Sequence, residues 1–305
     1  MATIDRTGIL RGPAQITYDG QVFWTKGNVS VTWENSVYDK ATDAFGIVGR
    51  CKTDAQIKVT FTPVGEIEAA PLGKLYPYAS TALGTSIFGS SDTTLEIKTL
   101  KNVLTLKNAA VTQMPSLTLG AGTTALGEVE FTGLVANNSE PDLSASYYTY
   151  TEGTQTFGTT FDPTKIVAGE YSSATFLGVT HVSTEGFSID FALNLAPVSV
   201  DTIGTVDMRL QDVNFSASWS PLNAYFPTQI LSNLATTAPG SNLYTAAMSI
   251  TGATGSVSFT ADKATLISSE TVFGTDANLN GPIQVSSTRD INSGALDPLF
   301  AVGIV

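Results

Sequence analysis

The sequence predicts a mainly β protein made of two tandem β-sandwich or barrel domains, each with one short helix. Three observations lead to this prediction. β-Branched residues dominate over good helix formers, short alternating segments lie between Gly, Asn and Asp residues, and long stretches of the first half return in the second. We place the boundary at the middle of the chain, so that residues 1–153 form the first domain and residues 154–305 the second.

Two blocks of the chain repeat in register. With one constant shift, the block 29–63 matches 187–221 without a gap. With a slightly smaller shift, the block 103–131 matches 257–285. The change of shift indicates a longer loop in the first domain, near "GTSIFGSSD" at residues 84–92. Ser, Thr and Gly bias would not reproduce glycines, aspartates and aromatics in register over two blocks, so we interpret the pattern as a tandem duplication.

The individual elements follow from alternation and from breaker residues. Upstream of the matched blocks, "VFWTKGNVSV" is expected to match "TFLGVTHVSTEGFSI", with a short insertion in the second copy. A short helix is predicted in "GEIEAAPLGKLYPY" and another in "SPLNAYFPTQILSNLA", where apolar residues share one helical face. Strands are predicted near 14–18, 21–25, 28–34, 56–62, 94–99, 102–107, 128–135 and 145–151, and near 175–180, 186–195, 212–220, 243–250, 256–261, 282–288 and 298–304.

Two long segments join predicted strands at matching places, residues 36–55 and residues 194–213. A connection of this length is unusual in a compact domain and is usually functional. Both contain Asp-x-x-Gly, which also suits an ordinary β-turn, so both interpretations stay open. The candidate functional residues in these segments are Asp39, Asp43, Phe45, Gly46, Arg50, Asp201, Gly204 and Arg209.

Two aromatic positions exchange between the copies. Trp33 and Phe61 of the first domain match Phe191 and Trp219 of the second. If the two positions pack together, the exchange nearly conserves core volume, which cores tolerate best. We therefore predict a core aromatic pair in each domain, and a structure that places Trp33 and Phe61 on opposite faces would exclude it.

Composition argues against several classes of function. The net charge of −12 is unfavourable for gripping nucleic acid, although an acidic protein could enclose DNA that slides. No apolar stretch is long enough to span a bilayer as a helix, and the N-terminus lacks the apolar core of a secretory signal, so no membrane insertion is predicted. Cys51 is the only cysteine, so no disulfide can form within the chain.

No catalytic or metal site is predicted, and no cofactor. His181 is the only histidine, so His and Cys residues cannot assemble a metal cluster within the chain. "DANLNG" at residues 276–281 resembles the start of a calcium loop, but Ser287 stands where the bidentate Glu is expected. Glu66 with Glu68, and Glu128 with Glu130, form spaced carboxylate pairs, for which a solvated surface is the favoured interpretation.

The stretch "GPAQITYDGQVFWTKGNVSVTWENSVYDKATDAFGIVGRCKTDAQIKVTFTPVGEIE", residues 12–68, resembles the N-terminal part of the major tail tube proteins of long-tailed bacteriophages. The features that carry the resemblance are "GPAxxTYDG", the segment from Asp43 to Gly46 before "GRCKTD", and the strand end "VTFTPVGE". The second copy departs from this motif at "SWSPLN", where Gly-Glu is missing.

The resemblance implies β-sandwich domains with one helix, joined into hexameric rings that stack as a hollow tube. Two domains in one chain then imply a trimer with pseudo-sixfold symmetry, and the candidate residues of segments 36–55 and 194–213 become candidates for contacts between subunits or between stacked rings. The implied partners are other copies of the chain, tail proteins at the tube ends, and duplex DNA that passes without specific binding. The implied location is the virion, after assembly in the host cytoplasm. Acidic residues would line the lumen, with Asp39, Asp43, Asp190 and Asp201 as candidates.

Two other functions remain open at this stage. The first is another virion or surface protein, such as a capsid decoration or an adhesin-like repeat, with "SYYTYT" at residues 146–151 as a receptor-binding patch. The second is a glycan hydrolase that uses two carboxylates, with Glu66 and Glu128 as candidates. Because neither carboxylate pair is duplicated, we expect the protein not to be an enzyme.

Overall fold

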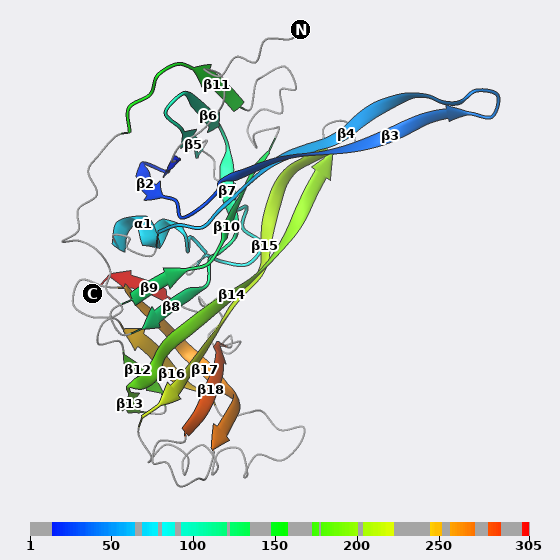
Figure 1. Ribbon diagram of the computed structural model, residues 1–305. Helices are drawn as coiled ribbons and strands as arrows, with labels where there is room; N and C mark the ends of the chain where they lie inside the picture. Colours follow the sequence, from blue (N-terminus) through cyan, green and yellow to red (C-terminus); the bar gives the residue numbers. More distant parts are fainter. Residues whose placement is uncertain are drawn as a thin grey trace.

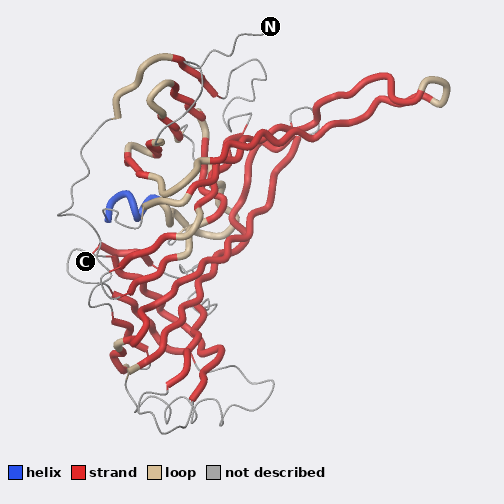
Figure 2. The backbone as a smooth tube through the Cα atoms, in the orientation of Figure 1, coloured by secondary structure: helices blue, strands red, loops and turns tan. Residues whose placement is uncertain are grey.

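Antiparallel strands make up most of the residues that the structure describes, and the mainly β class predicted from the sequence is confirmed (Figures 1 and 2). The structure is a computed structural model, and it describes residues 14–64, 69–78, 81–88, 93–120, 123–134, 148–157, 173–176, 178–200, 204–222, 245–251, 257–271, 280–287 and 301–304. Within these ranges there is one short helix, α1, at Ala69–Lys74. It lies inside the segment "GEIEAAPLGKLYPY", where a helix was predicted, and the helix predicted at 220–235 lies almost wholly outside the described residues.

Most described strands of the first half form two sheets. One has the order β11-β6-β5-β1-β2, and the other has the order β3-β4-β10-β7. The bounds of these strands are β1 Gln15–Tyr18, β2 Gln21–Trp24, β3 Ser30–Thr42, β4 Gly46–Phe61, β5 Leu95–Lys98, β6 Asn102–Leu106, β7 Ala109–Gln113, β10 Val129–Leu134 and β11 Tyr148–Glu152.

The second half repeats the same order of pairing. The strands β13-β12-β16-β17 follow one another, β19 pairs with the beginning of β17, and the end of β17 continues through β18 and β15 to β14. Because β17 belongs to both groups, the two sheets of the first half correspond to one continuous sheet here. The bounds are β12 Ser173–Phe176, β13 Val179–His181, β14 Ser183–Val200, β15 Gly204–Pro221, β16 Thr245–Thr251, β17 Val257–Thr271, β18 Asn280–Ser287 and β19 Ala301–Ile304.

The long hairpins of the two halves have the same register. β14 pairs with β15 as β3 pairs with β4, every pair keeps the constant shift of the first matched block, and both β-bulges recur at matching places. The strands next to these hairpins, β10 and β18, also correspond. Val129 of β10 lies opposite Phe61, and Ile283 of β18 lies opposite Trp219, which is the residue that matches Phe61. A tandem duplication accounts for these registers. The duplication itself and its boundary after residue 153 stay predictions.

The second matched block, residues 103–131 against 257–285, agrees with the strand pairing at its C-terminal end but is displaced by one residue at its N-terminal end. Val129 and Ile283 correspond as the sequence predicts. In β6, however, Leu104 takes the place of Phe259 and not of the preceding Ser258, because Leu104 pairs with Ile97 as Phe259 pairs with Ile250. The difference in loop length therefore arises in three places, which lie before β5, between β5 and β6, and between β7 and β10.

The two long segments expected to be loops are paired strands. Residues 36–42 continue β3 and residues 46–55 belong to β4, so only residues 43–45 form the turn; residues 194–200 and 204–213 extend β14 and β15 in the same way. The sequence pattern hid these strands, because bulges interrupt the alternation and the first hairpin is exposed on both faces.

The first hairpins also correspond without any insertion. β1 and β2 meet in a two-residue turn at Asp19 and Gly20, and β12 and β13 meet in a matching turn that ends at Gly178. Both glycines have a φ of 75°, which favours glycine. The shift that relates the long hairpins therefore already holds here, and the insertion predicted in the second copy is not present.

The predicted aromatic pair is corrected by the register. Trp33 lies opposite Ile57, contacts Tyr148 and is 46% exposed, so it is not a core residue. Phe61 is buried and packs against Phe23, with ring centroids 6.5 Å apart. The two positions share a face of β3–β4 but lie apart along the sheet, so their side chains reach different neighbours.

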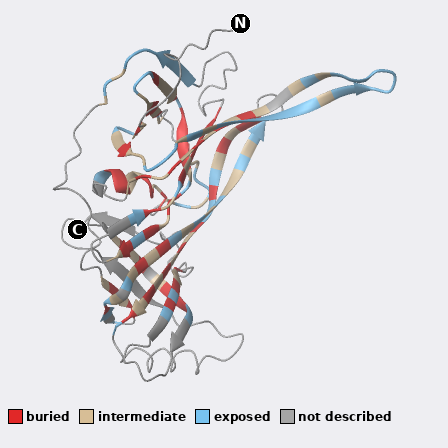
Figure 3. Cartoon of the chain, viewed as in Figure 1, coloured by how far each residue is buried: buried red, intermediate tan, exposed pale blue. Residues whose placement is uncertain are grey.

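The second half repeats this contact. Trp219 packs against His181 with centroids 6.0 Å apart, and His181 occupies the place of Phe23. The matching position to Trp33, Phe191, instead contacts Phe215 and Phe259. Figure 3 marks the buried residues along the ribbon. Most buried apolar side chains of the described residues form one hydrophobic cluster that includes both halves, and a second, small cluster contains Phe88, Ala110 and Leu134. The two halves therefore share a core.

Candidate self-assembly surfaces

The hairpin β3–β4 forms an arm that projects from the body of the molecule (Figures 1 and 3). We call residues 36–54 the first arm. Soluble monomers rarely expose contiguous apolar patches without a function, yet this arm carries five large apolar side chains that are 55–82% exposed. They are Val37, Tyr38, Phe45, Ile47 and Val48.

The candidate loop residues of the first half lie on this arm. Asp39 and Arg50 face each other across the hairpin, and the Arg50 Nε donates to Asp39 Oδ1 at 2.8 Å. Asp43 and Phe45 lie in the terminal turn, where the Phe45 backbone N–H donates to Thr42 Oγ1 at 3.2 Å. Gly46 follows with a φ of 67°, so glycine is favoured in this turn.

The matching arm of the second half, residues 194–212, packs against the first half instead of projecting. Its turn residue Gly204 is buried and has a φ of 89°, while Arg209 is exposed and lies 3.8 Å from Asp207. Thr205 is 4% exposed, whereas Ile47 at the same place on the first arm is 55% exposed. Asp201 lies outside the described residues.

Two parts of the first half cover this second arm. The segment 84–87 pairs with the edge of β15, through hydrogen bonds from Gly84 N–H to Leu210 O at 2.7 Å and from Leu210 N–H to Thr85 O at 3.0 Å. Asp54, at the base of the first arm, accepts from the backbone N–H and the hydroxyl of Thr205, both at 2.9 Å. A charged acceptor strengthens these bonds. The longer loop noted in the sequence therefore contributes to the contact between the halves.

A short hairpin of the first half also joins the sheet of the second. β8 at Leu117–Gly120 pairs with β9 at Thr123–Leu126 on one side and with β14 on the other, where Leu119 lies opposite Phe187 and Leu117 opposite Ile189. Leu117 and Leu119 are fully buried. The two halves are thus joined by backbone pairing and by apolar burial.

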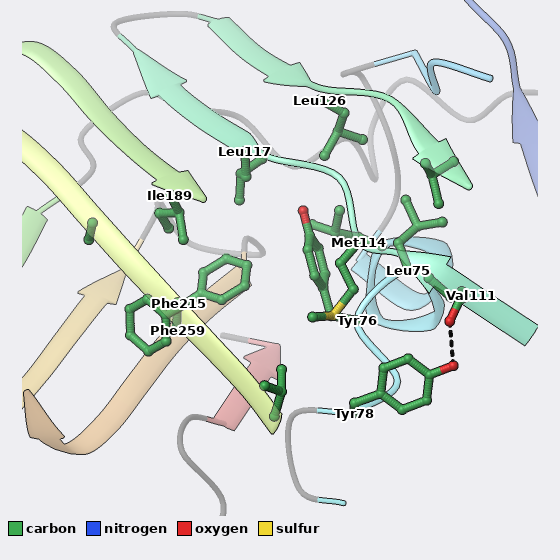
Figure 4. Packing of buried hydrophobic residues seen from close by; sticks show 14 of the residues in the cluster. Leu75, Tyr76, Tyr78, Val111, Met114, Leu117, Leu126, Ile189, Phe215 and Phe259 are labelled. Atoms are coloured by element: carbon green, nitrogen blue, oxygen red, sulfur yellow. Dashed lines mark hydrogen bonds between the residues drawn. The ribbon is translucent and has the colours of Figure 1, made fainter. Parts of the chain in front are cut away.

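Tyr76 completes the contact between the halves (Figure 4). It follows α1 and packs into the core of the second half, with its ring 4.6 Å from the Phe191 ring and 5.5 Å from the Phe259 ring. Its hydroxyl donates to Pro115 O at 3.0 Å, and burial raises the pKa of Tyr76 well above its usual value. Tyr78 is placed in a similar way, with its hydroxyl donating to Val111 O.

The first half has an open groove at the place that Tyr76 fills in the second. It has a volume of about 640 Å³ and lies between the start of β3 and the sheet formed by β5, β6 and β11. Apolar side chains line most of it, and Asn28, Thr99 and Asn102 add polar groups. The principal apolar lining residues are Val29, Val31, Trp33, Ile97, Leu104 and Tyr150.

The residues considered for chemistry are placed as follows. His181 is buried against Trp219, while Cys51 is half-buried on the first arm opposite Tyr38. Glu130 accepts a hydrogen bond from Thr112 at 2.9 Å, and Glu66 and Glu68 lie outside the described residues. Among the residues that the structure describes, no group of three or more His, Cys, Asp or Glu side chains is arranged to hold a metal ion.

Comparison with known proteins adds no family to these observations. No protein-family model matches the chain, and no curated protein matches its sequence. In the described part of the chain, no helix has the length and apolar character needed to cross a membrane.

The sequence indicates the arm residues as candidates, but it does not indicate the contact between the halves. Tyr76, the strand β8 and the segment 84–87 were not selected as functional residues. The length difference near residue 84 was a usable signal, because an insertion in one copy marks a place where the two copies have different neighbours. For Tyr76 and β8 the sequence offered no signal beyond apolar character, since their partners lie in the other half of the chain.

Proposed function

We propose that this protein is a structural subunit of a phage tail tube, in which three chains form a pseudo-hexameric ring and the rings stack around a channel for DNA. One observation supports this proposal above all. The second half is covered by the first along an arm, a sheet edge and an apolar site, while the matching arm, edge and groove of the first half are exposed.

The contact that joins the two halves of one chain can be repeated between chains. When two similar units join through different surfaces, each end of the pair keeps one unused surface, and further copies can add in the same way. If the rotation between units closes, the result is a ring. Exposed strand edges invite uncontrolled pairing, and a closed ring satisfies them. The resemblance of residues 12–68 to tail tube proteins selects the tube among closed assemblies.

The test is the mass and symmetry of the assembled protein. Native mass spectrometry should give a mass of three 32.0 kDa chains per ring, and electron microscopy should show rings or tubes with an open centre. A stable monomer at micromolar concentration would contradict the proposal. A ring of six chains would contradict the pseudo-hexamer and leave the tube in place.

The same experiment distinguishes the tube from one alternative, a surface protein of the decoration or adhesin type. Tyr148 and Tyr150 are 36% and 49% exposed, and such a protein could use them as a receptor patch. That function predicts isolated particles and binding to a surface glycan or protein. Since both residues line the groove, a tube predicts instead that they become buried on assembly.

A further inference from the structure

We propose that the groove of the first half, together with the adjoining edge of β3, is the docking site for the second half of a neighbouring copy of this chain. The inference deepens the proposed function and rests on it, because it names the surface through which subunits of a ring meet. It also specifies that the partner contributes its second half, which the existence of self-assembly does not by itself determine.

The groove has the character of an unfilled core rather than of a polar binding site. Trp33 and Tyr150 line it and are 46% and 49% exposed, while Ile97, which also lines it, is buried. Leaving two large aromatic side chains this exposed forgoes the favourable free energy of burying their apolar surface. An apolar side chain of a partner would recover it.

The pairing partners of the lining residues show that this groove corresponds to the site that Tyr76 fills in the second half. Trp33 corresponds to Phe191, because Trp33 lies opposite Ile57 and Phe191 lies opposite Phe215, at the same register of the two long hairpins. Leu104 corresponds to Phe259 in the same order of strands.

The occupant of the second-half site is therefore informative. Tyr76 of the first half packs on Phe191 and Phe259, the residues that match Trp33 and Leu104. Because a residue of the first half fills this site in the second half, we expect residues of a second half to fill the matching groove of the first half. Within one chain that half is already joined elsewhere, so the occupant comes from another copy.

The edge of β3 gives a second, independent correspondence. β8 covers β14 at residues 187–189, and the matching stretch is 29–31. In the described part of the chain β3 ends its sheet, with β4 as its only neighbouring strand. Val29 and Val31 from this stretch also line the groove, so one partner can pair with the edge and fill the groove together.

Photocrosslinking in the assembled protein tests the proposal. The photoreactive residue p-benzoylphenylalanine is placed at position 33 in full-length chains, and equal amounts of isotopically light and heavy chains are mixed before assembly. The exposed Trp33 site tolerates the substitution, and position 191 serves as the matched control. Mass spectrometry should then find crosslinks from position 33 to residues 154–305 of another chain, and from position 191 to the Tyr76 region of the same chain.

The outcomes separate the two proposals. Rings in which position 33 crosslinks to a first half, to its own chain or to nothing would overturn the docking site and leave the tube in place. A monomer without crosslinks between chains would overturn both. Val31→Trp, which fills the groove, should also raise the concentration needed for ring assembly at least tenfold, while Thr32→Trp on the other face of β3 should change it less than twofold.

Discussion

The contact between β8 and β14 makes Gly186 a sensitive position, and Gly186→Ala should destabilise the chain more than Gly178→Ala. Both glycines have a positive φ, 91° at Gly186 and 75° at Gly178, so an alanine costs about 1–2 kcal/mol at either place. They differ in their surroundings. A Cβ at Gly178 meets nothing within 4 Å, whereas a Cβ at Gly186 would lie 2.3 Å from Leu119 O, so β8 must move away.

The displacement of β8 sets the size of the difference. Leu117 and Leu119 are fully buried, and exposing each costs about 1.5–3 kcal/mol. If Gly186→Ala exposes half of this surface, its free energy of unfolding should fall by about 4 kcal/mol, against about 1–2 kcal/mol for Gly178→Ala. Urea titration followed by tryptophan fluorescence measures both. Equal losses for the two variants would refute the argument that β8 is held against β14 by this close approach.

Three further predictions concern single side chains. Burial lowers the pKa of His181 below 6.5, so the unfolded chain binds the proton more readily and the free energy of unfolding should fall as the pH falls below about 6.5. The variant His181→Phe carries the residue found at the matching position 23 and should remove this contribution to the pH dependence of the urea midpoint. Tyr76→Ala should lower the free energy of unfolding by about 3–5 kcal/mol and Tyr76→Phe by about 1 kcal/mol, measured in the same titration. Phe45→Ser should leave stability within about 0.5 kcal/mol, because the side chain is 82% exposed, and should weaken assembly in sedimentation velocity.

The sequence predicted the features that repeat between the halves. Fold class followed from β-branched composition and alternation, and the constant shift of the first matched block anticipated the common register of the long hairpins. The change of shift near residue 84 also located the segment that pairs with β15. These features depend on local pattern or on internal comparison, and a single sequence contains both.

The failures have a different origin. The arms were expected to be loops, because bulges interrupt the alternation of Val37 and its neighbours. The aromatic exchange was real, but Trp33 and Phe61 lie apart along the sheet and reach different partners. Trp219 packs against His181, which no aromatic pattern selects. Long-range contacts of this kind are fixed by packing and not by spacing along the chain.

The two arms show why assembly is the simplest account of these surfaces. Their backbones have one register, yet one is covered by the other half and one is exposed. Whether the repeated contact closes depends on a single quantity, the rotation that superposes the first half on the second. Six equivalent units around an axis require about 60° per step, and a rotation with an appreciable translation along the axis would give an open filament instead of rings. A pseudo-sixfold ring of three chains therefore requires that the step inside a chain and the step between chains be nearly equal, and the symmetry seen by electron microscopy tests this equality.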